Sequence, residues 1–162
     1  TLVDTGKESM TGGRIKRIQK YVGNEPFLLT YGDGVGNVDI AELVKCHEEN
    51  KKMVTVTAVQ PSGRFGALNL NESNQVNSFM EKPKGDGGWI NGGFFVLSPK
   101  VIELIGGDDV SWEQFPLEAL AEKEELLAYK HDGFWQSMDT LRDKNLLEEL
   151  WESGNAPWKV WK

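Results

Sequence analysis

Two aspartates lie where a carboxylate could hold a metal ion. Asp33 follows the most apolar segment of the chain, and its neighbours Gly32 and Gly34 let a ligand approach the backbone closely. Ligands bind at the carboxyl ends of strands in open α/β sheets, and a carboxylate there is a hard oxygen ligand suited to Mg²⁺. Asp139 precedes an expected helix. Each residue also has an ordinary structural interpretation, because aspartate is common in glycine turns and at helix N-caps.

Three further segments carry side chains suited to phosphate or sugar. Lys82 and Lys84 end an expected strand, where lysine either binds phosphate as a point charge or guards a solvated strand edge. The amide of Asn91 can both donate to and accept from sugar hydroxyls, although the glycines after it also fit a bulge. Arg14 lies near the opening of an expected helix, where backbone N–H groups favour an anion, and an arginine there is also commonly just solvated.

Other reactive residue types form no catalytic pattern. His47 lies on an apolar helix face and is expected to pack at the edge of the core, and His131 has no partner at motif spacing. Asp108 and Asp109 follow two glycines and are expected in a loop. No Ser/His/Asp or Cys/His arrangement supports covalent catalysis. The single cysteine, Cys46, excludes an internal disulfide, and no Cys/His cluster suggests zinc.

The composition is that of an ordinary globular domain with an acidic balance. The 162 residues include 18 Lys and Arg against 25 Asp and Glu, a net charge of −7. This charge argues against a nucleic-acid partner, but a few local cations can still bind a nucleotide. Apolar runs are far shorter than the roughly 18 residues of a membrane span, and no signal peptide opens the chain. We therefore expect a cytoplasmic enzyme or binding domain with no membrane partner.

The first part of the chain alternates helices with strands. A short strand is expected at residues 1–5 and a helix at 11–22, where apolar residues recur at helical spacing. The continuous apolar run at 27–31 is typical of a strand buried on both faces of a parallel sheet. Asp39 can cap the next helix, and alternating β-branched residues predict a strand at 53–59. Strand, helix and strand in this order predict a βαβ unit with a right-handed crossover.

After Pro61 the pattern changes, because three expected strands follow without a helix between them. The remaining expected elements are strands at 66–70, 75–81, 90–97 and 126–130, an extended piece at 134–136, and helices at 99–105, 111–123 and 140–151. This order predicts an α/β fold with a mixed sheet and an inserted β region. We expect a single domain, 1–162, with a mixed α/β core at 1–60 and 90–151, a β insertion at about 61–89 and an irregular Trp-rich tail at 152–162.

The order of the motifs resembles the sugar-1-phosphate nucleotidyltransferases over essentially the whole chain. The segments that carry the resemblance are Tyr31-Gly32-Asp33-Gly34, Phe79-Met80-Glu81-Lys82-Pro83, Ile90-Asn91-Gly92-Gly93-Phe94-Phe95-Val96 and Gly133-Phe134-Trp135-Gln136-Ser137-Met138-Asp139-Thr140. The last of these, with Leu141-Arg142-Asp143-Lys144 and Ala156-Pro157-Trp158-Lys159, looks most like the members that act on CTP and glucose 1-phosphate. The resemblance implies a partial Rossmann-like, GT-A-like nucleotidyltransferase fold.

The resemblance also implies a role for each candidate residue. Asp33 and Asp139 would bind one Mg²⁺, Lys82 would hold the sugar phosphate, and Asp33 and Lys82 would be the catalytic pair. The implied substrate-binding residues are Arg14, Tyr31, Gly32, Lys82, Asn91 and Gly92. The implied reaction transfers a cytidylyl group from CTP to glucose 1-phosphate, giving CDP-glucose and pyrophosphate, in a homo-oligomer.

One departure from the family pattern is large. The family opens with a glycine-rich loop of the Gly-x-Gly-Thr-Arg type, followed by a Pro-Lys pair, that cradles the triphosphate, and this sequence lacks the loop and roughly the first third of the family's chain. We therefore expect little activity from this chain alone, and self-association through a sheet edge or the Trp-rich tail. A non-catalytic remnant that binds sugar phosphate or forms oligomers stays open. A related glycosyltransferase is disfavoured, because Tyr31 and Val35 stand where an Asp-x-Asp motif would need a second carboxylate beside Asp33.

Overall fold

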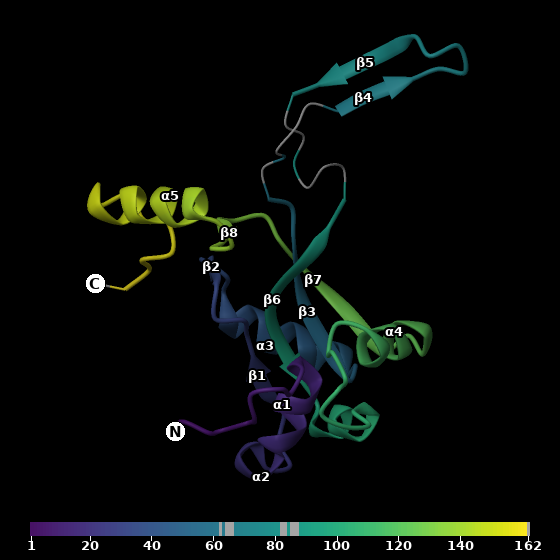
Figure 1. Cartoon of the computed structure of the whole chain (residues 1–162), viewed down its shortest axis with the longest axis vertical. Coiled ribbons are helices and arrows are strands. Elements are labelled where there is room, and N and C mark those ends of the chain that lie inside the picture. Colours follow the sequence, from purple (N-terminus) through teal and green to yellow (C-terminus); the bar gives the residue numbers. More distant parts are fainter. Residues whose placement is uncertain (62, 64–66, 82–83, 85–87, 162) are drawn as a thin grey trace. The chain divides into compact units, whose positions relative to one another are not determined.

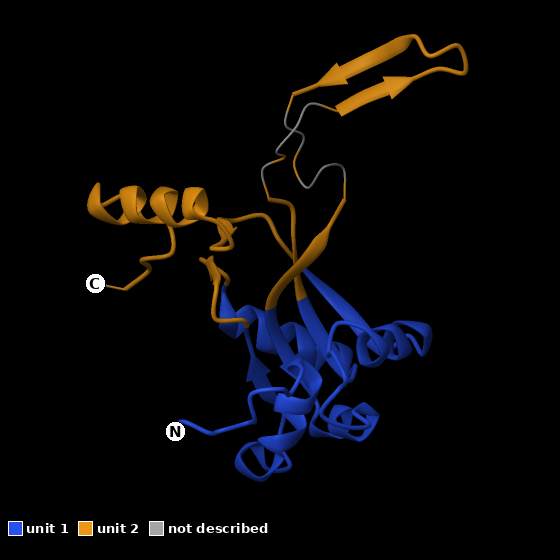
Figure 2. Ribbon diagram, viewed as in Figure 1, with its two compact units in different colours: residues 1–30, 39–56, 94–129 blue, residues 31–38, 57–93, 130–162 orange. Residues whose placement is uncertain are grey.

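The computed structural model describes residues 1–61, 63, 67–81, 84 and 88–161. They form two compact units, each built from three separate stretches of the chain (Figure 2). Unit 1 comprises Thr1–Thr30, Asp39–Val56 and Phe94–Tyr129, and unit 2 comprises Tyr31–Val38, Thr57–Gly93 and Lys130–Lys162. The predicted domain layout, with a core and a β insertion in one domain, stays a prediction.

A four-stranded sheet has most of its residues in unit 1 and the others in unit 2 (Figure 1). Its strands, in spatial order, are β1 (Phe27–Leu29), β6 (Ile90–Leu97), β3 (Val54–Val59) and β7 (Leu126–His131). The predicted strand and helix order is confirmed here, but β6 lies between β1 and β3, so these two strands are not neighbours. The long central strands are the most buried part of the sheet, since five of the six residues of β3 are buried.

The prediction that the apolar run at 27–31 is buried on both faces of a parallel sheet is wrong. Strand β1 is an edge strand that runs antiparallel to β6, with Phe27 opposite Leu97 and Leu29 opposite Phe95. The side chain of Leu28 is 54% exposed, so only one face of the strand is covered. A strand is fully buried only when other elements pack on both faces of its sheet. An apolar run does not show whether an element packs on the second face.

Helices pack around this sheet, and most begin where the sequence predicts. The helices of unit 1 are α1 (Thr11–Arg17), α2 (Gln19–Val22), α3 (Ile40–Asn50), the 3₁₀ helix η2 (Pro99–Leu104) and α4 (Phe115–Glu122). The carboxylate of Asp39 accepts the Glu42 N–H at 3.0 Å, which confirms the predicted N-cap of α3. None of the helices among the described residues is long and apolar enough to cross a membrane.

Three further predicted elements of unit 1 differ in the structure. The helix expected at 11–22 is two helices, α1 and α2, divided at Ile18. Residues 1–5 form no strand, and the Asp4 carboxylate instead accepts the Gly6 N–H at 2.8 Å in a local turn. The helix expected from residue 111 begins only at Phe115, because the Trp112 N–H donates to Thr11 Oγ1 and its indole is completely buried. Packing of this tryptophan against Phe95, at 6.1 Å between ring centroids, outweighs the local helix signal.

The glycine pair at the start of α1 serves close packing. A Cβ on Gly12 would lie 2.6 Å from the Val110 carbonyl oxygen, and one on Gly13 would lie 2.6 Å from that of Asp108. The Gly13 N–H also donates to Val110 O. Asp108 forms an ion pair with Arg17, whose guanidinium holds the pKa of that carboxyl below its usual value. The expectation that Asp108 belongs to a loop agrees with this structure.

Unit 2 contains two separate two-stranded sheets and the last helix (Figures 1 and 2). Its further elements are β2 (Gly34–Gly36), β4 (Ala67–Leu70), β5 (Val76–Met80), β8 (Trp135–Ser137) and α5 (Leu141–Glu152). Strands β4 and β5 confirm the strands expected after Pro61, apart from Gly66, which lies outside the described residues. Strand β2 is not expected from the sequence, because Gly32-Asp33-Gly34 is typical of a turn.

His47 is a packed core residue, as its position on the apolar face of α3 predicts. It is 5% exposed, and its Nδ1 lies 3.0 Å from Thr55 Oγ1 of β3. Burial disfavours the charged imidazolium and lowers the pKa of His47 below its ordinary value of 6.5. The folded state therefore binds a proton at this residue less readily than the unfolded state does.

We expect the free energy of unfolding to fall as the pH drops below about 6.5, because the unfolded chain takes up a proton that folded His47 resists. The loss continues until the pH passes the lowered pKa of the folded state. His47→Gln should lower the free energy of unfolding by about 1–3 kcal/mol at neutral pH. The free energy of unfolding of this variant should also change less with pH between about 7.5 and 5.5. Urea denaturation of both proteins measures this difference, and equal pH dependence would contradict it.

Candidate functional site

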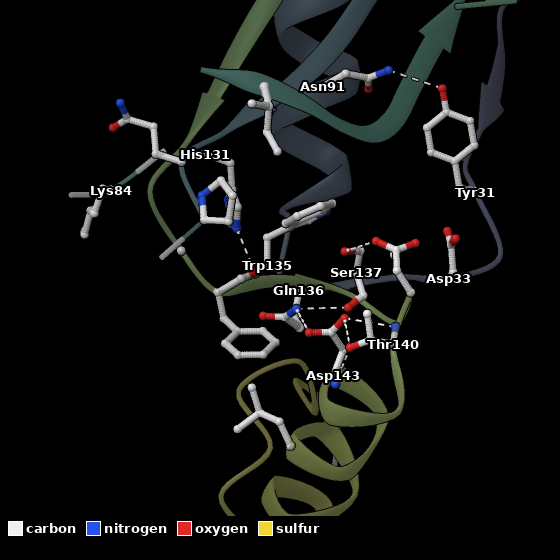
Figure 3. A pocket seen from close by; sticks show the side chains of 18 of the residues that line it. Tyr31, Asp33, Lys84, Asn91, His131, Trp135, Gln136, Ser137, Thr140 and Asp143 are labelled. Carbon is white, nitrogen blue, oxygen red and sulfur yellow. Dashed lines mark hydrogen bonds between the residues drawn. The ribbon is translucent and has the colours of Figure 1, made fainter. Parts of the chain in front are cut away.

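A large open cavity lies within unit 2. Its volume is about 1270 Å³, and its wall comes from the segment before β2, the start of β6, strand β8 and the first turn of α5 (Figure 3). Five of the eight residues predicted to form a site line this one cavity: Tyr31, Gly32, Asp33, Asn91 and Asp139. Residues far apart in the sequence thus share one wall, as a catalytic or binding site requires.

The pairing of β2 with β8 brings the two aspartates to the same cavity. Gly34 lies opposite Ser137 in the antiparallel ladder, and the Met138 N–H donates to the Asp33 carbonyl at 2.8 Å. Asp33 comes just before β2, and Asp139 comes two residues after β8, so both lie at the same end of this ladder. Their side chains line the cavity from opposite strands of the pair.

The surroundings of the two carboxylates do not match the ordinary interpretations of these residues. The carboxylate of Asp33 makes no hydrogen bond or ion pair with another described residue, so it does not cap its own turn. The N-cap of α5 is Thr140 and not Asp139. The Asp139 carboxylate instead accepts the Ser137 hydroxyl at 2.7 Å (Figure 3).

Two exposed carboxylates suit one kind of metal ion. Mg²⁺ keeps several water ligands and binds through one or two carboxylates together with substrate phosphates. Among the described residues, no group of three or more His, Cys, Asp or Glu side chains could enclose a metal. Asp33 and Asp139 therefore fit Mg²⁺ held jointly with phosphate, and their role as metal ligands stays a prediction.

A hydrogen-bond network fixes the chain on either side of Asp139. The Asp143 carboxylate accepts the Thr140 N–H at 3.0 Å and its hydroxyl at 2.7 Å, while Thr140 Oγ1 accepts the Asp143 N–H at 3.2 Å. Asp143 also accepts the side-chain amide of Gln136 in β8 at 3.2 Å. This reciprocal capping box ties the start of α5 to β8 (Figure 3). The sequence carries the signal for this network, Thr140 followed three residues later by Asp143.

Asn91, the second residue of strand β6, faces the cavity. Its amide nitrogen donates to the Tyr31 hydroxyl at 3.2 Å (Figure 3). Its amide oxygen accepts the Gly93 N–H at 2.9 Å. Gly93 has φ +76°, a left-handed conformation that favours glycine. The side chain of Asn91 is thus both part of a backbone irregularity and held toward the cavity by Tyr31.

Gly92 has a structural reason to be glycine. A Cβ at this position would lie 2.8 Å from Val59 of β3. Its carbonyl accepts the indole N–H of Trp135 at 2.7 Å, which fastens β8 to the start of β6. Gly92 itself is buried and is not one of the residues that line the cavity. Its predicted part in substrate binding stays a prediction.

The remaining predicted site residues are not in the cavity wall as described. Lys82 lies outside the described residues, whereas the neighbouring Lys84 lines the cavity. Arg14 belongs to α1 of unit 1, where its guanidinium donates to Thr5 Oγ1 at 2.8 Å and to the Lys7 carbonyl at 3.3 Å. The assignment of Lys82 and Arg14 to substrate therefore rests on the sequence alone.

The part of the cavity wall between β7 and β8 contains an aromatic contact that the sequence analysis did not predict. The Phe134 carbonyl lies 3.2 Å from His131 Nε2 and accepts the Asn37 N–H at 3.1 Å. The Phe134 ring lines the cavity and packs on Trp158 of the C-terminal tail, with 5.3 Å between ring centroids. The partner of His131 is thus a backbone carbonyl only three residues along the chain. Only the Trp-rich character of the tail could have hinted at this contact.

The family of the chain follows from comparison with known proteins. The family model described as "Nucleotidyl transferase" matches residues 6–145, most of the sequence. The chain belongs to the nucleotidyltransferase family. This membership confirms the predicted resemblance.

Curated relatives within this nucleotidyltransferase family carry a more specific name. The chain is 60% identical to glucose-1-phosphate cytidylyltransferase of Salmonella typhi over 163 residues, which cover 100% of the chain and 63% of the relative. It is 43% identical to the probable glucose-1-phosphate cytidylyltransferase of Bacillus subtilis, with 99% of the chain and 63% of that relative covered. The chain thus spans less than two thirds of the length of these relatives.

Solved structures confirm the predicted fold as part of a sugar nucleotidyltransferase. A UDP-glucose pyrophosphorylase complexed with UDP-glucose matches with a TM-score of 0.68 at 13% identity, over 95% of this chain and 66% of that one. HddC from Yersinia pseudotuberculosis matches with a TM-score of 0.63 at 25% identity, over 88% of this chain and 62% of that one. The mixed α/β architecture of the nucleotidyltransferase is thereby established at the level of fold.

The capping network predicts which aspartate supports the fold. Asp143→Ala should lower the free energy of unfolding by about 2 kcal/mol, because it removes the acceptor for Thr140 and Gln136 at a helix N-terminus. Asp139→Ala is the matched control and should change it by less than about 0.5 kcal/mol, because Asp139 is exposed. Urea denaturation measures both values. A loss in the Asp139 variant as large as in the Asp143 variant would show that the cap is assigned to the wrong residue.

Proposed function

We propose that this chain carries the metal-binding and sugar-phosphate-binding part of an enzyme that transfers a cytidylyl group from CTP to glucose 1-phosphate. The products are CDP-glucose and pyrophosphate. The observation that carries the proposal is the β2–β8 ladder, which brings Asp33 and Asp139 to one cavity within unit 2. The identity of 60% to a glucose-1-phosphate cytidylyltransferase along the whole chain supports the choice of base and sugar.

The proposed reaction joins two polyanions. A phosphate oxygen of glucose 1-phosphate attacks the α-phosphorus of CTP in line, the new P–O bond forms, and the bond to the β-phosphate oxygen breaks to release pyrophosphate. The protein needs no nucleophile of its own for this step, so its work is positioning and neutralisation of charge. The absence of a covalent catalytic pattern in the sequence agrees with such a mechanism.

The predicted site residues have matching tasks in this proposal. Asp33 and Asp139 would hold Mg²⁺, which supplies positive charge beside the phosphate oxygens when bound. Lys82 would bind the phosphate of the sugar as a point charge. Asn91, oriented by its bond to the Tyr31 hydroxyl, would exchange that bond or add one with a hexose hydroxyl.

Ligand binding by the cavity can be separated from turnover. These 162 residues contain no Gly-x-Gly-Thr-Arg loop with a following Pro-Lys pair, which the family uses to cradle the triphosphate. The cavity of unit 2 could by itself still bind a sugar phosphate or a nucleotide sugar. Binding and turnover therefore have to be measured separately.

For binding, we expect the 162-residue chain to bind CDP-glucose more tightly with Mg²⁺ than without it. Asp33→Asn and Asp139→Asn should each remove roughly tenfold or more of the Mg²⁺-dependent affinity, since one charged contact is worth about 1.5–3 kcal/mol. Isothermal titration calorimetry with CDP-glucose, with and without Mg²⁺, measures the effect. Asp109→Asn, an exposed loop aspartate of unit 1, is the matched control for loss of one negative charge.

The two possible failures have different meanings. Unchanged Mg²⁺ dependence in the Asp33 and Asp139 variants would refute their assignment as metal ligands. A wild-type chain that binds no CDP-glucose with Mg²⁺ present would refute the binding function itself.

For turnover, we expect this chain alone to release little or no pyrophosphate from CTP, glucose 1-phosphate and Mg²⁺. Loss of a single preorganised donor costs about 10²–10³ in rate, and this sequence lacks the whole triphosphate loop. A coupled pyrophosphate assay measures the rate. Release at roughly 1–10³ s⁻¹, which is typical of enzymes, would contradict the expectation and show that the cavity of unit 2 is sufficient for catalysis.

A further inference from the structure

His131, the last residue of β7, lines the cavity of unit 2 but has no task in the proposed reaction. Its Nε2 lies 3.2 Å from the Phe134 carbonyl oxygen (Figure 3). A carbonyl oxygen only accepts hydrogen bonds, so Nε2 carries the hydrogen and Nδ1 of the neutral ring carries none. No described residue donates a hydrogen bond to Nδ1. A second proton therefore binds at Nδ1 and gives the ring a positive charge.

The turn between β7 and β8 fixes the position of this ring. A Cβ on Gly133 would lie 2.5 Å from Cε1 of His131 and 2.4 Å from Oδ1 of Asn37, so the ring and the amide oxygen both lie against this glycine. Oδ1 of Asn37 is buried and has no hydrogen-bond partner among the described residues. The negative end of an unpaired carbonyl dipole beside the ring favours the imidazolium over the neutral imidazole.

Histidine is the residue type in this wall whose charge the pH sets near neutrality. The charged side chains that line the cavity with His131 are Asp33 before β2, Lys84, the neighbouring Asp132, Asp139 after β8, and Arg142 and Asp143 at the start of α5. Lys130 precedes His131 in β7, but its ammonium lies over the Trp89 ring, 5.2 Å from the centroid. Between about pH 6 and 8, aspartate, lysine and arginine ordinarily keep their charge, whereas histidine changes its charge.

We propose that His131 binds the phosphate groups of a nucleotide sugar in this cavity and does so only when the ring is protonated. The neutral ring presents Nδ1 as an acceptor, which repels the lone pairs of a phosphate oxygen. The imidazolium presents an Nδ1–H donor together with a positive charge, and such charge-assisted hydrogen bonds are the stronger ones. Phosphate and the proton therefore strengthen each other's binding, so the complex takes up a proton as it forms.

This assignment deepens the proposed function and rests on it, because the ligand is taken to be the nucleotide sugar. It is separate from the metal-binding assignment. His131 lies apart from Asp33 in the cavity (Figure 3), and no hydrogen bond among the described residues joins its ring to Asp33 or Asp139. The consequence for the reaction is that the nucleotide sugar binds more tightly in acidic solution and leaves more readily in alkaline solution.

Isothermal titration calorimetry of CDP-glucose with Mg²⁺, in buffers of different ionisation enthalpy, measures the proton uptake. CDP-glucose lacks the second ionisation near about pH 6 that a terminal phosphate has, so the pH dependence comes from the protein. The wild-type chain should bind CDP-glucose roughly fivefold more tightly at about pH 6 than at about pH 8. This dependence corresponds to an average uptake of about 0.3–0.5 proton per complex.

Two variants identify the group that takes up the proton. His131→Gln keeps an N–H for the Phe134 carbonyl but does not titrate, so its affinity should change less than about twofold between the two pH values. His47→Gln is the matched control, because His47 is the other histidine of the chain and is buried in unit 1. This control should take up the proton as the wild-type chain does.

NMR of the imidazole nitrogens tests the same step in the wild-type chain, which covers the case in which a variant does not fold. The chain has two histidines, so both rings can be followed separately. The neutral ring of His131 should carry its hydrogen on Nε2. Saturating CDP-glucose should raise the pH at which His131 loses its charge and should leave the titration of His47 unchanged.

Several results would overturn the role of His131 and leave the proposed binding function intact. One is a wild-type chain that binds CDP-glucose without proton uptake. Another is a His131→Gln variant that retains the full pH dependence. An NMR titration of His131 that CDP-glucose does not move, or a neutral ring with its hydrogen on Nδ1, would also refute it. A wild-type chain that binds no CDP-glucose at either pH would instead refute the binding function and the role of His131 together.

Discussion

The antiparallel pairing of β2 with β8 is the contact on which the candidate site depends. Only three residue pairs form this ladder, from Gly34 opposite Ser137 to Gly36 opposite Trp135. The pairing nevertheless joins a segment that follows β1 to a segment that precedes α5, and Asp33 and Asp139 lie where the strands leave it. A short ladder of this kind has little stability of its own, so the contacts at its two ends decide whether the aspartates stay together.

Those contacts differ in chemistry at the two ends. At the end near Asp139, buried Asp143 binds Gln136 and Thr140 and fixes the first turn of α5. At the other end, the indole of Trp135 donates to the Gly92 carbonyl, and the Phe134 carbonyl accepts the Asn37 N–H. A Cβ on Gly36 would lie 3.1 Å from the Phe134 oxygen, a tight contact that glycine avoids. The carboxylates of Asp33 and Asp139 support none of these contacts, although that of Asp139 accepts the Ser137 hydroxyl.

The sequence predicts elements well where local signals and packing agree. Helix α3 has its N-cap and its apolar spacing, and β3 has alternating β-branched residues, and both appear near their predicted bounds. Prediction failed where a distant contact decided the outcome. Strand β2 forms only because β8 pairs with it, and the start of α4 is delayed because Thr11 binds the Trp112 backbone. The candidate site was reached through the order of its motifs and not through any single one, since each motif also fits a turn, a cap or a bulge.

The charges around the cavity constrain how any anionic substrate could bind. The wall includes four aspartates, Asp33, Asp132, Asp139 and Asp143, against the two cationic side chains of Lys84 and Arg142 among the residues described there. Asp143 is occupied by its hydrogen bonds, but the exposed aspartates place negative charge where a phosphate would enter. A polyanion gains little in such a cavity unless a cation arrives with it or before it. Binding of phosphate and binding of a divalent cation are then thermodynamically coupled, so each must raise the affinity for the other by the same factor.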